Sequence, residues 1–164
     1  MDRREQELAM LASDIMVRRV IKVKETDTVE TAIERFAAYR VSALPVVNER
    51  NEISGLISQR DVMQYIRNFD IKFWIFQTYM PLPVYIDEEA IGSKWQRLAG
   101  RNVMEIAARD VTTVPVDSNI EEVATLFCNR RVQKVIVERN GVLAGMISRG
   151  DIIRYLAECA SAAH

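Results

Sequence analysis

The chain has 164 residues and few of the side chains from which most catalytic centres are built. Its single histidine is His164, at the last position, so no internal imidazole is available for a Ser-His-Asp or Cys-His arrangement or for zinc binding through histidine. Its two cysteines, Cys128 and Cys159, are expected to be reduced thiols on helix faces, because a chain of this size needs no disulfide to hold its core. We therefore expect no catalytic residues, no metal site and no enzyme activity.

An excess of charge of one sign and long apolar runs are also missing. Lys and Arg number 22 against 23 Asp and Glu, so the formal net charge is -1 and no overall cationic field attracts nucleic acid or anionic lipid. No uninterrupted apolar stretch approaches the roughly 18 residues of a membrane span, and the charged residues 1–13 lack the apolar core of a signal peptide. We expect a cytoplasmic globular protein that binds neither nucleic acid nor membranes.

What the sequence does contain is an internal repeat. The segment GLISQRD, Gly55 to Asp61, recurs as GMISRGD, Gly145 to Asp151. The similarity extends toward the N-terminus of each copy, where VIKV at 20–23 matches VTTV at 111–114 and YRVSALPVV matches RRVQKVIVE. Self-similarity of this kind indicates that one supersecondary unit occurs twice.

Each repeat is predicted to fold as β-α-β-β-α, with the first two strands parallel because a helix joins them. The capping-box patterns Asp27-x-x-Glu30 and Ser118-x-x-Glu121 predict the starts of the first helices. Apolar residues then recur at helical spacing, and two β-rich runs separated by a polar turn precede a last helix. The predicted strands are 20–23, 44–47, 53–58, 111–114, 135–137 and 142–148, and the last helices begin at Asp61 and Asp151.

One such unit leaves its sheet half covered, and two units packed together solve that problem. We therefore expect a mixed α/β (α+β) fold in which the two repeats form an intramolecular pseudo-twofold pair. The apolar positions predicted to face the core from the first helices are Val29, Ala32, Ile33, Phe36 and Ala37 in one repeat and Ile120, Val123, Ala124, Phe127 and Cys128 in the other.

These motifs closely resemble a pair of CBS domains, the regulatory modules named after cystathionine β-synthase, in the tandem arrangement called a Bateman module. The residues that carry the resemblance are Asp14-Ile15-Met16, the phrase VSALPVV from Val41 to Val47, and the Gly-h-h-Ser-x-x-Asp signature in both repeats, where h is apolar. One signature alone would be a weak match. Two copies with matching strands and helices around them make the resemblance specific.

The resemblance implies a non-catalytic sensor that binds adenosine-containing ligands (AMP, ADP, ATP or S-adenosylmethionine) in clefts between the repeats. In that family the signature aspartate holds the ribose hydroxyls, the Ser or Thr and nearby basic residues meet the phosphates, and apolar strand residues enclose the adenine. Matched motif by motif, the ribose role falls to Asp61 and Asp151 and the hydroxyl role to Ser58 and Ser148. The other predicted ligand-binding residues are Val20, Ile21, Val41, Ser42, Ala43 and Arg60, then Val111, Thr112, Val132, Lys134 and Arg149.

The chemistry of the signature supports two interpretations. A carboxylate can accept from both hydroxyls of a ribose, and the free N–H groups at a helix N-terminus favour a phosphate. However, Ser58-x-x-Asp61 and Ser148-x-x-Asp151 also have the form of capping boxes, whose Ser and Asp only cap the last helix. At the level of the sequence both interpretations stay open.

The two copies also differ from each other. Ile136 stands where the first repeat has Pro45, so the second strand can donate a ladder hydrogen bond that the first cannot. The extra cationic side chains of the second copy would suit more phosphate charge, so we expect it to be the stronger site for phosphorylated ligands. These side chains are Lys134 and Arg149, in the positions of Ala43 and Gln59.

The segment between the repeats, residues 67–100, holds seven of the twelve aromatic residues. Phe69, Phe73, Phe76 and Met80 recur at helical spacing among other apolar residues, which predicts a helix that is apolar nearly all round. Such an insert can be additional core, a protein interface or a pocket for an apolar ligand. Because CBS pairs commonly associate as flat dimers through their helices, the resemblance implies a homodimer, and we expect the insert to help form it.

The predicted organisation is an N-terminal helical lead at 1–12, CBS repeat one at 13–66, the aromatic helical insert or linker at 67–100, CBS repeat two at 101–160 and a tail at 161–164. The leading functional hypothesis is a regulatory module that senses an adenosine-containing ligand and transmits a conformational change. The alternative is a dimerisation or protein-interaction scaffold with vestigial ligand sites. No effector domain is recognisable in the sequence, so we expect the output to pass to an unidentified effector protein.

Overall fold

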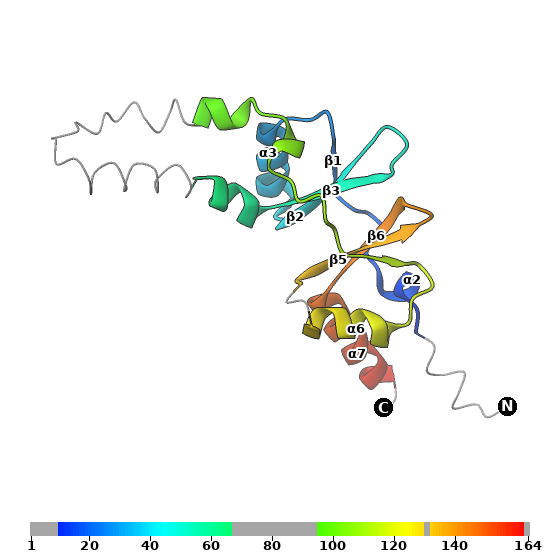
Figure 1. The fold of residues 1–164 in the computed structure, drawn as a ribbon. Coiled ribbons are helices and arrows are strands. Elements are labelled where there is room, and N and C mark those ends of the chain that lie inside the picture. Colours follow the sequence, from blue (N-terminus) through cyan, green and yellow to red (C-terminus); the bar gives the residue numbers. More distant parts are fainter. Residues whose placement is uncertain (1–9, 67–94, 130–131, 163–164) are drawn as a thin grey trace. The chain divides into compact units, whose positions relative to one another are not determined.

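The computed structural model describes residues 10–66, 95–129 and 132–162 (Figure 1). Most of the predicted N-terminal lead and residues 67–94 of the aromatic insert lie outside these ranges, so the predictions made for them remain predictions. The structure divides into two compact units. Unit 1 contains the residues up to Val20, Glu49–Ile53 and the residues from Asp110 onward, and unit 2 contains Ile21–Asn48 and Ser54–Arg109.

Unit 2 is built on a three-stranded sheet in the order β1-β2-β3. Its strands are β1 (Val23–Lys24), β2 (Ala43–Val47) and β3 (Ile53–Ser58), and α3 (Val29–Tyr39) joins β1 to β2. β1 and β2 are parallel, as the intervening helix predicted. Residues 59–66 and 95–99 are helical, and a short 3-10 helix, η1 (Val103–Glu105), follows.

Unit 1 repeats this arrangement with the sheet β4-β5-β6. β4 (Thr113–Pro115) pairs parallel with β5 (Lys134–Arg139), and β5 pairs antiparallel with β6 (Val142–Ser148), so the predicted second hairpin is confirmed. Figure 1 shows α6 (Ile120–Asn129) and α7 (Arg149–Ala162) on one side of this sheet. The fold is thus mixed α+β, with two small sheets and helices. No helix in the described part of the chain is long and apolar enough to cross a membrane.

The two cores are formed by equivalent residues of the two repeats. In unit 2, Val29, Ala32 and Phe36 from α3 pack with buried strand residues. In unit 1, Val123 and Phe127 from α6 do the same. The buried stripe of each helix is narrower than predicted, because Ala37 and Cys128 are exposed. The buried strand residues are Val23, Leu44, Val46 and Ile57 in unit 2 and Val114, Val135, Val137 and Ile147 in unit 1.

The predicted helix caps are wrong by one residue in both repeats. Thr28 caps α3, its side chain accepting from the N–H of Thr31, and the Asn119 side chain accepts from the N–H of Glu121 at the start of α6. The caps lie one residue later because of tertiary contacts, which the capping pattern does not include. Thr28 and Asn119 each form an antiparallel bridge to a distant segment. That bridge holds them in the extended conformation that an N-cap requires. The Asp27 carboxylate instead accepts from the Lys24 N–H at 2.8 Å, closing the turn after β1.

The distant segments are the residues that precede each repeat's first strand, and each packs in the unit of the other repeat. In unit 1, Val17 bridges to Met146, and the Ile120 N–H donates to the Met10 carbonyl. In unit 2, Leu56 and Ala108 exchange two backbone hydrogen bonds of 2.9 Å. Each unit is therefore completed by the leading segment of the other repeat.

The glycine of each signature makes this packing possible. A Cβ atom at Gly55 would lie 2.8 Å from the Ala108 carbonyl oxygen, and one at Gly145 would lie 2.6 Å from the Met16 sulfur. Both distances are shorter than van der Waals contact allows. The absence of a side chain therefore lets the leading segment lie directly on the strand.

Candidate functional site

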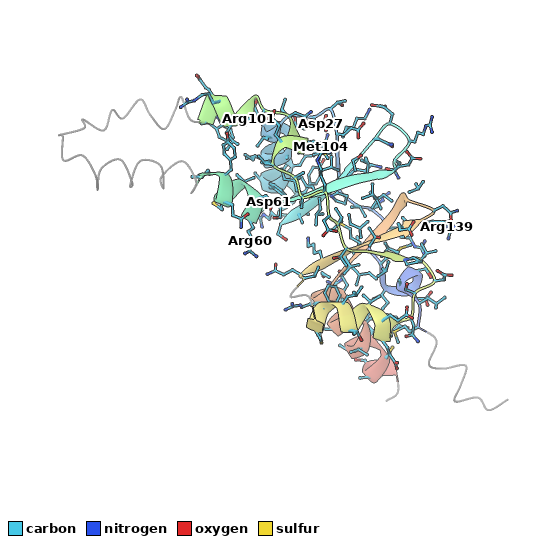
Figure 2. All side chains as sticks on the ribbon, viewed as in Figure 1. Asp27, Arg60, Asp61, Arg101, Met104 and Arg139 are labelled. Carbon is cyan, nitrogen blue, oxygen red and sulfur yellow. The ribbon has the colours of Figure 1, made fainter. Side chains whose placement is uncertain are left out.

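The signature residues of the first repeat lie where β3 meets the helix of residues 59–66. The Asp61 carboxylate oxygen Oδ2 accepts from the Ser58 backbone N–H at 2.7 Å and from the Ser58 hydroxyl at 2.6 Å. The Asp61 N–H lies 3.3 Å from the Ser58 hydroxyl oxygen. Figure 2 shows Arg60 and Asp61 side by side at the start of this helix.

The second repeat has the same geometry at the junction of β6 and α7. The Asp151 Oδ2 accepts from the Ser148 N–H at 2.8 Å and from the Ser148 hydroxyl at 2.6 Å, and the Asp151 N–H is 3.3 Å from that hydroxyl oxygen. These bonds are the reciprocal pair of a capping box, so both serines cap their helices. In each copy the bonds use one carboxylate oxygen and leave Oδ1 outside the cap.

The predicted adenine-binding phrase of the first repeat lies beside its signature. The Gln59 backbone N–H donates to the Ser42 carbonyl at 3.0 Å, and its side-chain amide donates to the Val41 carbonyl at 3.1 Å. Val41 is half-buried, Ser42 is exposed and Ala43 is buried as the first residue of β2. The structure therefore brings Val41, Ser42 and Ala43 together with Ser58 and Asp61.

The remaining predicted residues of the first repeat are placed less centrally. Ile21 is half-buried and packs against the core of unit 2, and Arg60 is exposed. Val20 is half-buried but belongs to unit 1, because the division between the units falls between Val20 and Ile21.

In the second repeat the predicted residues gather at the start of β5. Lys134 pairs with Ser148 in the β5–β6 register, and the Thr112 carbonyl accepts from the Ile136 N–H at 3.3 Å. That bond is the one predicted from isoleucine in place of proline. Val111 precedes Thr112 and is half-buried, and half-buried Val132 packs against the core of unit 1.

Arg149 has a structural partner as well as a place beside the signature. Its guanidinium donates to the Phe127 carbonyl at 3.3 Å, near the C-terminus of α6, where a cation satisfies a free carbonyl. Sequence analysis missed a second arginine, Arg154, whose Nη1 lies 3.3 Å from the Asp151 Oδ1. Alignment of the repeats could have found it, because Gln64 occupies the same position in the first copy.

The side chains gathered at each signature suit hydrogen bonding. Among the described residues no group of three or more His, Cys, Asp or Glu side chains could hold a metal ion. Each copy brings together the Asp carboxylate, the Ser hydroxyl and the N–H groups at the start of a helix, directly after β3 or β6. Such a set can accept from hydroxyl groups and donate to an anion.

Comparison with known families identifies the fold. A family model described as CBS domain matches residues 12–68 and 103–158. The chain belongs to the CBS domain family. It carries two CBS domains in tandem, and pairs of this kind are regulatory modules.

Relatives of known sequence share the pair along most of this chain. An uncharacterized protein of Methanocaldococcus jannaschii, MJ1426, is 25% identical over 154 residues, which cover 90% of this chain and 91% of that protein. The 5'-AMP-activated protein kinase subunit gamma-3 of Bos taurus is 30% identical over 135 residues, 82% of this chain but 23% of the subunit. The chain therefore spans only a small part of the length of that relative.

A solved structure of CBSX2, described as a complex with AMP, superposes on the CBS pair with a TM-score of 0.69. It is 19% identical in sequence, and the match covers 92% of this chain and 98% of that one. At this level of identity the likeness shows the fold, and the tandem CBS pair is the fold that the repeats predicted.

Proposed function

We propose that this CBS pair senses an adenosine-containing ligand, with Asp61 and Asp151 accepting from the ribose hydroxyls. The observation that carries the proposal is the geometry common to both copies, in which Ser58 and Ser148 each bind one carboxylate oxygen and leave the other outside the cap. An aspartate held by its own serine has a fixed orientation, which lowers the entropic cost of binding a diol. The AMP named with CBSX2 supports an adenine nucleotide as the ligand.

The other predicted contacts follow from their places in each unit. In the first copy Ile21, Val41, Ser42 and Ala43 supply the apolar strand surface for the base, and Arg60 supplies a cation. In the second copy Lys134 and Arg149 take the cationic role. The base-binding residues of the second copy are Val111, Thr112 and Val132, and Val20 is assigned to the base of the first copy together with Ile21.

A thermal-shift panel of AMP, ADP, ATP, S-adenosylmethionine and NADH tests the proposal. A ligand at ~100 times its dissociation constant should stabilise the folded protein by about 2.7 kcal/mol, visible as a raised melting midpoint. The double variant Asp61→Asn, Asp151→Asn is the matched control, because it keeps an oxygen for the cap and loses the carboxylate charge. A midpoint that no member of the panel shifts at millimolar concentration contradicts the proposal.

If no ligand shifts the melting midpoint, the protein is better described as a scaffold with vestigial ligand sites. The capping geometry is the observation that favours this second function. The bonds between Ser58 and Asp61 account for both side chains without any ligand. A scaffold predicts the same melting midpoint with and without nucleotides, and loss of helix stability in Asp61→Ala. The two functions are therefore separated by the ligand panel and not by the stability of the variants.

We also propose that the protein forms a homodimer through its last helices. Met63 and Ile66 are exposed in the first repeat, and their equivalents in α7, Ile153 and Leu156, are exposed as well, with exposed fractions between 46% and 65%. An apolar pair that recurs in both repeats suits a twofold contact with a second copy. A ligand-dependent change in this dimer would then be passed to another protein, which is also part of the proposal.

Light scattering of Met63→Glu and Ile153→Glu tests the dimer. A charge at an interface hot spot should cost at least ~2 kcal/mol of association and raise the monomer fraction at micromolar concentration. Gln64→Glu, one residue along the same exposed helix, is the control and should leave the mass unchanged. A monomeric wild type, or variants that remain folded dimers, would exclude this interface.

A further inference from the structure

The two signature aspartates differ in what holds their second carboxylate oxygen. In the second copy the Arg154 Nη1 lies 3.3 Å from the Asp151 Oδ1, one turn along α7. In the first copy the equivalent position is Gln64, and no ion pair of Asp61 is found among the described residues. The oxygen that the proposed function assigns to a ribose hydroxyl is therefore already paired in one copy.

The exposure of the Arg154 side chain makes this pair easy to open. The Arg154 side chain is 67% exposed and the Asp151 side chain 11%. Exposed ion pairs are worth at most about a fivefold change in an equilibrium constant, whereas a charge-assisted hydrogen bond to a phosphate is worth about tenfold or more. A ligand with a phosphate therefore offers the guanidinium a better partner than Asp151 does.

Arg154 is also the more available of the two arginines near this aspartate. Arg149 already donates to the Phe127 carbonyl, and its release would leave a carbonyl of α6 without that donor. In the described structure Arg154 has the Asp151 carboxylate as its ion-pair partner and otherwise extends into solvent. Its guanidinium can leave Asp151 without breaking a backbone contact.

We propose that Arg154 sets the ligand selectivity of the second CBS domain. It pairs with the Asp151 Oδ1 in the free protein and transfers to a phosphate group of the bound ligand, which releases that oxygen for the ribose. An unphosphorylated nucleoside must displace Arg154 and gives it no new partner. The second domain therefore selects phosphorylated over unphosphorylated adenosine compounds, and the first domain, with Gln64, does so much less. This inference rests on the proposed function.

Calorimetric titration with AMP and with adenosine tests the inference. Asp61→Asn confines binding to the second domain, and Arg154→Gln and Arg154→Lys are made in that background. Arg154→Gln should lower the ratio of AMP affinity to adenosine affinity by about tenfold, combining a loss for AMP with a gain of up to about fivefold for adenosine. Arg154→Lys should keep most of the ratio, because it keeps the charge.

The reciprocal change is the matched control. Gln64→Arg in an Asp151→Asn background should raise the same ratio in the first domain. If Asp61→Asn does not fold, two-site fits of wild type and Arg154→Gln supply the ratio. The inference is overturned if Arg154→Gln changes the ratio of AMP affinity to adenosine affinity by less than about twofold, because this is less than the contribution of one exposed ion pair. In that case AMP binding would still support the proposed function. A wild type that binds neither compound overturns both.

Discussion

Units 1 and 2 share the β-α-β-β-α elements of the repeat, yet their parallel strand pairs differ in length. β4 pairs with β5 at Thr113, Val114 and Pro115, whereas β1 pairs with β2 only at Val23 and Lys24. The missing pair would involve Pro45, which has no N–H to donate, and Ile136 supplies that N–H in unit 1.

Unit 2 has a side-chain contact at the start of its first strand. The Lys22 carbonyl accepts from the Arg35 guanidinium, which also lies 3.7 Å from the Asp27 carboxylate. The bond that Pro45 cannot make would go to the Ile21 carbonyl, so this contact is separate from it. The comparison teaches that one residue on a central strand decides how far the parallel ladder extends.

The largest effect that would sharpen this comparison is expected at the signature glycines. In Gly55→Ala the new Cβ would meet the Ala108 carbonyl oxygen, which accepts from the Leu56 N–H, and the Ala108 N–H holds the same residue by donating to the Leu56 carbonyl. We expect a loss of about 3 kcal/mol in the free energy of unfolding, at the upper end for overpacking. Urea unfolding followed by circular dichroism measures it.

Gly145→Ala is the matched variant in unit 1. Its Cβ would meet the Met16 side chain, which has rotatable bonds and can move further than a backbone carbonyl. The expected loss is about 1 to 2 kcal/mol, and Met16→Ala should relieve part of it in the double variant. Equal losses for the two glycines, without rescue, would show that backbone and side-chain neighbours resist equally.

The next effect concerns the strand pair itself. Ile136→Pro removes the N–H that donates to the Thr112 carbonyl and should cost about 2 to 3 kcal/mol of stability. Ile136→Val is its control, because it keeps the N–H and shortens the side chain at a cost of about 1 kcal/mol. Pro45→Ile should change stability by less than about 1.5 kcal/mol. A comparable loss in Ile136→Pro and Ile136→Val would remove the N–H from the explanation.

The same contrast extends to ligand binding. Asp151→Ala should weaken AMP binding by about 1.5 to 3 kcal/mol, and more than Asp61→Ala does, because the second copy, which carries Lys134 and Arg149, is expected to be the stronger site for a phosphorylated ligand. Each substitution removes the same set of cap bonds, and Asp151→Ala also removes the ion pair to Arg154. Titration calorimetry below the melting range compares them, and a greater loss for Asp61→Ala would reverse the predicted asymmetry.

Local signals predicted the elements well, because each repeat carries its own periodicity, turns and signature. β3 and β6 begin and end where the sequence predicted, and the Ser-x-x-Asp bonds have the predicted capping form. The helix starts could not be predicted from the pattern alone. Thr28 and Asn119 become caps through bridges to residues far away in the chain, which a local capping box does not encode.

The first strands show the same limit. Val20 and Ile21, like their equivalents Val111 and Thr112, lie before the ladder although both pairs have the character of a strand. Lys22, the equivalent of Thr113 in β4, lies outside β1 because Pro45 on the neighbouring strand removes the donor. The role of Arg154 was also not predicted, since an exposed arginine one turn after the signature looks like solvated surface until its distance to Asp151 is known. A residue on the neighbouring strand accounts for the first omission, and a contact one turn along the same helix accounts for the second.

The smallest effects are expected at the caps. Thr28→Ala and Asn119→Ala should each cost about 1 kcal/mol of stability, because each leaves a helix N–H without its side-chain acceptor. Ser118→Ala should change stability by less than about 0.5 kcal/mol, since no helix N–H donates to its hydroxyl. Thermal unfolding compares the stability of the three variants. A larger loss of stability for Ser118→Ala than for Asn119→Ala would favour Ser118 as the cap, as the sequence predicted.

The crossed leading segments also set an order of events during synthesis. Unit 2 has all its residues once Arg109 has left the ribosome, so it can close while translation continues. Ala12 and Met16, which are buried in unit 1, must wait for β6 and Ser148, which follow Arg109 by a few seconds at about 5–20 residues per second. A nascent chain stalled between these points exposes that apolar segment beside a finished unit, and it is the segment that a chaperone would bind.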